Sequence, residues 1–379
     1  MPGLKWLAAR PGIAGGARAG RNTGGDELPR IRLTRGRVLG TLLFVGSAVG
    51  FLYFVLPKLL GLNETWNRIQ HGNAWWLALG AVLEICSFFG YVALFRGVFI
   101  RGESRIDWSE SYQITMASLA ATRLFAAAGA GGIALTAWAL RRSGMARRTV
   151  ARRMIAFMAL LYGVYMLTLV LGGVGLYVGL IPGPAPFAIT IIPAIFGAAV
   201  ITLFLGIAML PSDVSRLVRS LAAGRGRSSR FAVRLVAASA TASSGVRTAI
   251  GLLRSRHPSL LGALAWWGFD IAVLWACFHA FGASPPNGVI VMSYFVGMLA
   301  NTLPLPGGIG GVDGGMIGAF TAFGVDVELS VVSVLAYRAF AFWLPTLPGA
   351  LAYFQLRRTV HRWGDERPAM LRGASEPAS

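Results

Sequence analysis

Long runs of apolar residues alternate with short polar segments along most of the chain. Six of these runs are long enough to cross a bilayer as an α-helix, which takes about 20 residues. They occupy residues 38–60, 75–99, 154–181, 187–210, 258–282 and 329–356. The pattern therefore predicts an all-α fold, a polytopic bundle of membrane-spanning helices.

Two further apolar regions, 111–140 and 287–323, are interrupted by glycine near their middles. The first interruption is Ala-Gly-Ala-Gly-Gly at 128–132, and the second is Leu-Pro-Leu-Pro-Gly-Gly-Ile-Gly-Gly-Val-Asp-Gly-Gly at 303–315. Proline removes a backbone donor, and each glycine weakens a helix by about 1 kcal/mol. Each region is predicted to be a helix–break–helix hairpin, although paired full crossings would also return the chain to its starting side. Broken backbone is tolerated at membrane depth only beside protein or a water-filled cavity, so the breaks should mark an interior site.

The two hairpins show signs of an internal repeat. At an offset of 179 residues, Gly131-Gly132-Ile133 aligns with Gly310-Gly311-Val312. Each hairpin also follows an apolar run that carries one acid, Glu84 in the first case and Asp270 in the second. Together with the topology, this similarity predicts an inverted repeat, a common plan of membrane transporters. The alternative is a chance similarity between Gly-rich apolar segments.

Composition and charge placement support a membrane protein. The chain is 55% hydrophobic and 13% charged, with a mean hydropathy of +0.62 and a net charge of +20. Of the 35 cationic residues, 31 lie in segments that alternate onto one side of the predicted membrane. The positive-inside rule then places both termini in the cytoplasm. The preference for Arg over Lys and the many Ala and Gly residues are typical of a bacterial protein. Nucleic-acid binding is not expected, because the arginines follow the membrane borders.

The sequence predicts one membrane domain with two flanking segments. Residues 1–37 are rich in Arg and Gly and are expected to be a disordered, basic cytoplasmic arm. The transmembrane domain is predicted to span 38–356, followed by a cytoplasmic tail at 357–379. Cys86 and Cys277 have no second Cys or His at ligand spacing, so we expect neither a disulfide nor a metal site.

Charged residues inside the apolar regions are the candidate site. A charge at the bilayer centre costs at least about 2.5–3.5 kcal/mol, so such residues usually face an interior and carry function. A phosphodiester suits the fork of an arginine, and Arg338 is placed to pair with Asp313. The competing interpretation is a set of internal ion pairs that only hold helices together. The candidate substrate-binding residues are Glu84, Arg123, Gly131, Gly132, Asp270, Gly307, Gly308, Gly310, Gly311, Asp313 and Arg338.

Signatures of enzymes are weak. Residues 129–134 fit G-x-G-x-x-A, but no βαβ pattern surrounds them, and neither Gly run continues into G-K-[ST]. We therefore expect no catalytic residues, no cofactor and no enzymatic activity.

Two motifs resemble a known family. The run at 303–315, followed by Phe323-Gly324-Val325 and Ala336-Tyr337-Arg338, resembles the carboxy-terminal signature of the lysylphosphatidylglycerol synthase transmembrane (flippase-like) family. The segment GAGGIALTAWALRRSG at 129–144 resembles the family's first Gly-rich motif. The resemblance covers about residues 38–356. It implies an integral protein of the inner (cytoplasmic) membrane, related to the domain that moves aminoacylated phospholipid between leaflets. The soluble aminoacyl-transferase domain of the two-part enzymes is not found here, so synthase activity is not expected.

This chain departs from the family pattern at two places. Asp313 stands where the family often has Glu, and Ala126-Ala127-Ala128 stand where its first motif usually has Pro.

Two functions remain open at this point. The first is a lipid flippase or transporter whose partners are membrane lipids with anionic or lipid-linked head groups. The second is a non-transporting membrane scaffold for an envelope glycosyltransferase or lipid synthase. A homo-oligomer or a membrane-enzyme partner is compatible with both.

Overall fold

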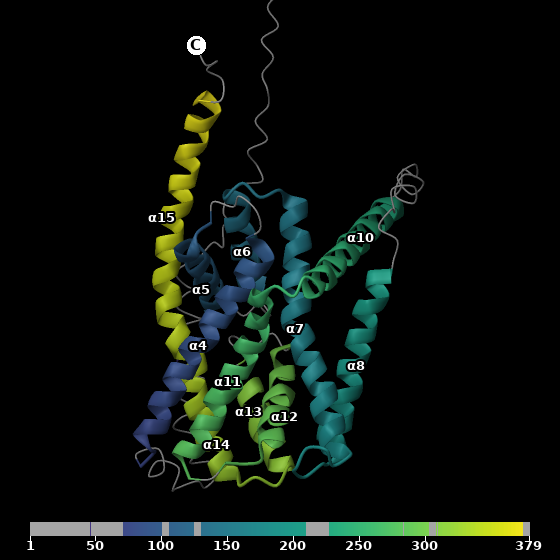
Figure 1. Ribbon diagram of the computed structural model, residues 1–379, viewed down its shortest axis with the longest axis vertical. Coiled ribbons are helices and arrows are strands. Elements are labelled where there is room, and N and C mark those ends of the chain that lie inside the picture. Colours follow the sequence, from purple (N-terminus) through teal and green to yellow (C-terminus); the bar gives the residue numbers. More distant parts are fainter. Residues whose placement is uncertain are drawn as a thin grey trace, which may run out of the picture. The chain divides into compact units, whose positions relative to one another are not determined.

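The computed structural model describes residues 46, 71–100, 106–124, 130–209, 227–282, 284–302, 308 and 310–373. In this part of the chain every regular element is a helix (Figure 1). The α-helices are α4 (Ala74–Phe99), α5 (Trp108–Leu124), α6 (Ala130–Arg142), α7 (Arg147–Tyr177), α8 (Phe187–Met209), α10 (Arg227–Arg254), α11 (Leu261–Ala280), α12 (Asn287–Met298), α13 (Gly311–Ala322), α14 (Val327–Arg338) and α15 (Leu344–Gly373). Short 3-10 turns η2 (Pro258–Leu260) and η3 (Leu299–Thr302) and a π-helical turn η5 (Ala339–Trp343) join some of them.

Among the described residues, five helical segments are long and apolar enough to cross a membrane: Ala74–Phe99, Arg147–Tyr177, Phe187–Met209, Pro258–Ala280 and Val327–Trp363. They confirm five of the six predicted spans, with ends that differ by a few residues. The sixth, 38–60, lies outside the described residues except for residue 46. On α7 and α8, Leu171, Ile195 and Leu203 are each more than half exposed. Such outward apolar side chains suit contact with lipid.

Both predicted hairpins contain a pair of packed helices on either side of their break. Helices α5 and α6 pack against each other, as do α12 and α13. Gly132 and Gly297 lie at the crossings: a Cβ on Gly132 would come within 2.5 Å of the Ser118 carbonyl oxygen, and one on Gly297 within 2.7 Å of the Met316 nitrogen. The connecting residues 125–129, 303–307 and 309 lie outside the described part of the chain.

The order of elements repeats once. A long helix (α4), a hairpin (α5, α6) and a long helix (α7) are followed later by α11, a second hairpin (α12, α13) and α14. In Figure 1, α5 and α6 lie toward one end of the helices, while α12 and α13 lie toward the other. The inverted symmetry that relates the two halves stays a prediction.

Helices α4 and α11, which begin the two halves, make the most extensive helix–helix contact among the described residues. Small residues permit this close approach: a Cβ on Gly262 would lie 2.3 Å from the Gly90 carbonyl oxygen and 2.7 Å from the Leu94 nitrogen. Close to this crossing, the buried Ser87 hydroxyl donates a hydrogen bond of 2.9 Å to the Trp266 carbonyl. The crossing fixes α4 against α11, which are the helices that carry the two buried acids Glu84 and Asp270.

Helix α15 packs along α5 and continues past residue 356. Thr359 donates to the side-chain oxygen of Gln113 at 2.9 Å, and the Trp363 indole donates to Glu110 at 3.2 Å. The predicted boundary at residue 356 therefore falls inside a helix whose later residues still contact the bundle.

The α4–α11 crossing generates a stability prediction. Gly262→Ala should destabilise the protein by about 1–3 kcal/mol, because the new methyl group would meet backbone atoms that cannot move aside. Gly268→Ala on the same helix is the matched control, since a Cβ there has no neighbour within 4 Å. Thermal unfolding of the detergent-solubilised protein, followed by circular dichroism, measures both. Equal midpoints for the two variants would contradict the close crossing.

Candidate functional site

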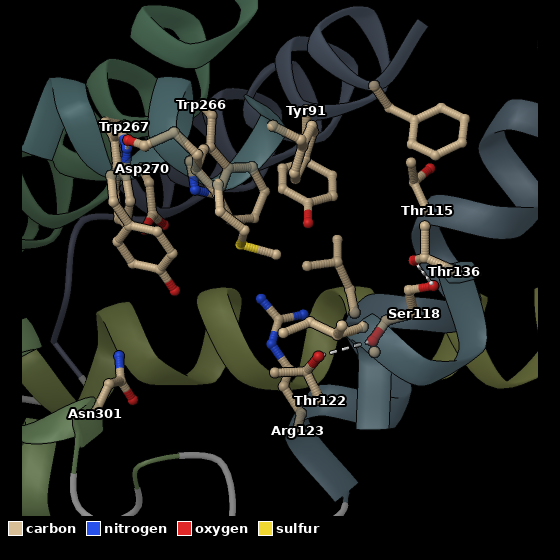
Figure 2. Close-up of a pocket in the computed structure, with 18 of the residues that line it drawn as sticks. Tyr91, Thr115, Ser118, Thr122, Arg123, Thr136, Trp266, Trp267, Asp270 and Asn301 are labelled. Atoms are coloured by element: carbon tan, nitrogen blue, oxygen red, sulfur yellow. Dashed lines mark hydrogen bonds between the residues drawn. The ribbon is translucent and has the colours of Figure 1, made fainter. Parts of the chain in front are cut away.

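A cavity of about 440 Å³ lies among the helices of both halves (Figure 2). Its walls come from α4, α5, α6, α7, α11 and α14, together with residues near the second Gly-rich segment. Ile133, Tyr162 and Asn301 line the cavity and are also exposed, which indicates that it is open to the surroundings of the protein. Residues at both breaks, Arg123 just before the first and Gly308 within the second, therefore line one space.

Arg123 occupies the last turn of α5 and lines this cavity. Its Nη1 atom is buried and has no hydrogen-bond partner. Figure 2 shows the guanidinium pointing into the cavity, toward Tyr91 and Trp266. It interacts electrostatically with Glu84 and Asp270 but makes no direct ion pair with them. A buried donor without an acceptor is costly, so this atom is arranged to meet a ligand or a water.

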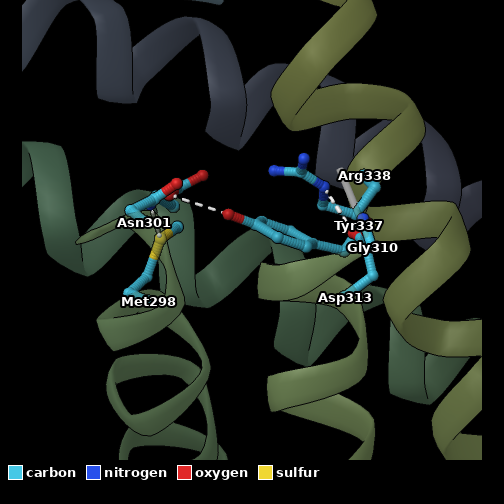
Figure 3. Close-up of polar contacts among 7 residues, drawn as sticks. Met298, Asn301, Gly310, Asp313, Tyr337 and Arg338 are labelled. Carbon is cyan, nitrogen blue, oxygen red and sulfur yellow. Dashed lines mark hydrogen bonds and ion pairs between the residues drawn. The ribbon is translucent and has the colours of Figure 1, made fainter. Parts of the chain in front are cut away.

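Arg338, at the end of α14, forms the other cationic part of the wall. Its Nε atom lies 2.6 Å from Oδ1 of Asp313 (Figure 3). The side chain of Asp313 is 2% exposed, and its Oδ2 accepts a 2.7 Å hydrogen bond from the Gly310 N–H. Asp313 therefore caps the first turn of its own helix and neutralises Arg338. The predicted ion pair is confirmed.

Glycine makes the turn in front of Asp313 possible. Gly308 and Gly310 have φ values of +68° and +81°, a left-handed backbone conformation that is strained for residues with a side chain. The turn places the Gly310 N–H over the Asp313 carboxylate, as the distance above shows.

Asp270 lies on α11 and is held by two tyrosines. The Tyr337 hydroxyl donates to its Oδ2 at 3.0 Å, and the Tyr294 hydroxyl donates a short hydrogen bond to the same oxygen. Glu84 on α4 faces Asp270 across the α4–α11 contact, and the two carboxyl groups interact electrostatically. Glu84 is 1% exposed, and its Oε2 atom has no hydrogen-bond partner. Two buried carboxyl groups thus meet behind one wall of the cavity.

A row of hydroxyl groups on α5 forms a polar wall. Thr115, Ser118 and Thr122 recur at helical spacing and all line the cavity. Ser118 and Thr136 of α6 are hydrogen-bonded at 2.7 Å, and the Thr122 hydroxyl donates to the Ser118 carbonyl at 2.9 Å. These hydroxyls place hydrogen-bonding groups on the α5 side of the cavity, which also carries Arg123.

Aromatic rings form the opposite wall. Tyr91 packs on Trp266 and Phe157, with ring centroids 4.6 and 5.3 Å apart. Tyr162 and Trp267 extend the same surface. The cavity therefore has one polar, cationic side and one apolar, aromatic side, which matches a ligand with a polar head and an apolar body.

The structure brings together most of the predicted site residues. Five line the cavity: Arg123, Gly132, Asp270, Gly308 and Arg338. Asp313 contacts this group through Arg338, Gly310 donates in turn to Asp313, and Glu84 interacts electrostatically with Asp270. Gly131 and Gly311 lie in α6 and α13 without lining the cavity, and Gly307 lies outside the described residues.

Sequence reasoning missed the tyrosines and the hydroxyl row. Tyr337 directly precedes Arg338, and its place in the motif could have drawn attention to it. Tyr294 stands in an apolar helix with no local signal that it would meet Asp270. The spacing of Thr115, Ser118 and Thr122 was a usable signal, because three hydroxyls share one face of an apolar region.

Comparison with known proteins identifies the relationship. The sequence profile of the family described as lysylphosphatidylglycerol synthase TM region matches residues 38–349. The chain belongs to this family. The match includes every residue that lines the cavity. The resemblance inferred from the two Gly-rich motifs is confirmed, and the protein is a multi-pass membrane protein.

Curated relatives match over shorter regions. Three "UPF0104 membrane protein" sequences from Methanothermobacter thermautotrophicus are 34% identical over 91 residues, 31% over 115 and 33% over 91. These regions cover 24%, 28% and 23% of this chain, and 26%, 34% and 27% of the relatives. The matched regions thus span about a quarter to a third of each relative.

The ion pair of this family member generates a second prediction. Asp313→Ala removes the ion pair with Arg338 and the acceptor of the Gly310 N–H, so it should destabilise the protein by about 3–5 kcal/mol. Asp313→Asn should cost less, because its amide oxygen can still accept from the Gly310 N–H. Unfolding in detergent measures both variants, with Gly318→Ala on the same helix as control, since a Cβ there has no neighbour within 4 Å. A wild-type midpoint for Asp313→Ala would show that the pair contributes nothing.

Proposed function

We propose that this protein is a lipid transporter, which binds the phosphate of a membrane-lipid head group in the cavity and lets it cross the bilayer. The acyl chains stay in the hydrocarbon during the crossing. The observation that carries this proposal is the buried Nη1 atom of Arg123, which lines the cavity and has no protein partner.

The cavity supplies what a phosphate needs and hydrocarbon lacks. Moving a charged group into an apolar medium costs many kcal/mol unless it finds an opposite charge and hydrogen bonds. An arginine can offer two parallel N–H groups to two phosphate oxygens, and Thr122 and Ser118 lie beside it. Arg338 adds positive charge on the same cavity surface.

The other wall favours a lipid over a soluble anion. The aromatic side chains of Tyr91, Trp266 and Trp267 would contact the apolar part of the ligand. A volume of about 440 Å³ lies within the range of small-molecule sites, roughly 300–1,000 Å³, and suits a head group better than a whole lipid. Membership of a family named for a membrane region of a phospholipid synthase supports the same substrate class.

The two halves of the chain suggest how access could alternate. In transporters built from inverted repeats, one repeat rocks against the other around a fixed site. Here the cavity receives residues from both halves, and α4 and α11 form the contact between them. We place the protein in the cytoplasmic membrane with both termini in the cytoplasm, acting on anionic or lipid-linked head groups without enzymatic chemistry.

The proposal predicts a defect when Arg123 loses its charge. In proteoliposomes carrying fluorescent phospholipid and a leaflet-selective quencher, Arg123→Gln should slow lipid transfer about tenfold or more, because a hydrogen bond to a charged group contributes roughly 1.5–3 kcal/mol. The transfer rate of Arg123→Lys should fall between those of the wild type and Arg123→Gln, since lysine keeps the positive charge but lacks the two parallel N–H groups of the guanidinium. Arg148→Gln, at the exposed start of α7, should transfer lipid at the wild-type rate.

Anionic, zwitterionic, aminoacylated and polyprenyl-phosphate lipids should be tested in parallel. Transfer no faster than in protein-free vesicles for all four would refute transport and favour a membrane scaffold. Transfer that is equally fast in Arg123→Gln would keep the transporter but remove Arg123 as the phosphate ligand.

A further inference from the structure

We propose that Glu84 and Asp270 share one exchangeable proton, and that a second proton binds when an anionic head group enters the cavity at Arg123. The protein would then move one proton together with each phosphodiester. This inference rests on the head-group site proposed above, and it supplies an energy source for that transport.

Two buried carboxyl groups that face each other favour one shared proton, because like charges at close range cannot both ionise without a large cost. Two carboxylates offer only acceptors to each other, so a hydrogen bond between them needs one to be protonated. Asp270 accepts from the hydroxyls of Tyr294 and Tyr337, which favours the ionised form at Asp270. Glu84 lacks such donors, and its Oε2 atom is unpartnered, so the proton belongs on Glu84.

Charge balance leads to the same count. The buried ionisable side chains at the site comprise three acids, Glu84, Asp270 and Asp313, and two cations, Arg123 and Arg338. If all were ionised, the group would carry one excess negative charge. One proton on the Glu84–Asp270 pair makes the empty site neutral.

A bound phosphate changes that balance. A phosphodiester brings one negative charge and engages Arg123, which otherwise compensates Glu84 and Asp270. Arg338 cannot replace it, because its Nε already pairs with Asp313 at 2.6 Å. Uptake of a second proton by the carboxyl pair restores neutrality, and binding should therefore strengthen as the pH falls.

Protons can reach the pair through the cavity. Asp270 lines the cavity, and Glu84 lies directly behind it. The other titratable or charged side chains that face the pair or Arg123 from the surrounding helices are Tyr91 on α4, Tyr162 on α7, Cys277 on α11, Tyr294 on α12, and Tyr337 and Arg338 on α14. All of them except Arg338 are neutral in their ordinary state at pH 7, so the two carboxyl groups are the proton acceptors.

Infrared spectroscopy tests the shared proton without any transport. Purified wild-type protein in detergent should show the C=O band of a protonated carboxylic acid at neutral pH. Glu84→Gln should lose this band, while Glu328→Gln should keep it. A wild-type spectrum without the band would overturn the shared proton.

Proteoliposomes with an imposed pH gradient test the coupling. With an alkaline interior and fluorescent phosphatidylglycerol, the wild type should accumulate label in the inner leaflet, and Glu328→Gln should do the same. The double variant Glu84→Gln/Asp270→Asn should still move lipid, because Arg123 is intact, but without a response to the gradient, because neither side chain can take up a proton. Apparent affinity in the wild type should rise by up to about tenfold for each unit of pH lowered, as expected for one proton per phosphate.

The two proposals fail in different ways. Lipid transfer that depends on Arg123 but ignores the gradient would overturn proton coupling and leave the transporter standing. Absence of transfer for every lipid would overturn the transporter and the coupling together, and the infrared band would then stand only for a structural proton.

Discussion

A charge placed within membrane-spanning helices must be compensated inside the protein, and this constraint organises the cavity. Asp313 and Arg338 compensate each other directly, and the Gly310 N–H completes the environment of the aspartate. Asp270 is held by two tyrosine hydroxyls, with Glu84 beside it. Arg123 is the remaining member, compensated only at longer range. Within this polar group Arg123 Nη1 and Glu84 Oε2 have no hydrogen-bond partner, and of these two residues Arg123 is the one that lines the cavity.

Close helix crossings make that arrangement possible. Glu84 and Asp270 meet because α4 and α11 approach with backbone nearly in contact at Gly90 and Gly262. Larger residues there would separate the helices, and the two carboxyl groups would no longer share a site. Gly132 and Gly297 serve the two hairpins in the same way. Glycines that stand out in sequence as helix breakers therefore act in this fold as packing positions as well, as expected where backbones approach closely in membranes.

Much of this fold could be predicted from the sequence, because hydrocarbon imposes long apolar runs that are easily recognised. Five spans and the helices that flank both breaks follow from that rule. The Asp313–Arg338 pair could also be anticipated, since few charges are available in those segments. The contacts of Tyr294 and the aromatic wall could not, because a buried tyrosine or tryptophan looks alike in sequence whether it fills a core or lines a cavity. Those contacts depend on helix rotation, which composition does not encode.

Arg338 and Arg123 differ in whether they already have a partner, and this difference determines which ligand chemistry the cavity favours. Arg338 is committed to Asp313, and its role is to position the second Gly-rich segment and to add positive charge to the wall. Arg123 keeps a donor unsatisfied, so it is the group available to a phosphate. No carboxylate is similarly available among the described lining residues, since Asp270 is already occupied by two hydroxyls. A cationic group on the same lipid would instead meet the faces of Tyr91 and Trp266, which attract cations more weakly than a carboxylate does. Under the proposed function, the cavity would therefore select first for the phosphate, the part shared by many membrane lipids, and only secondarily for what is attached to it.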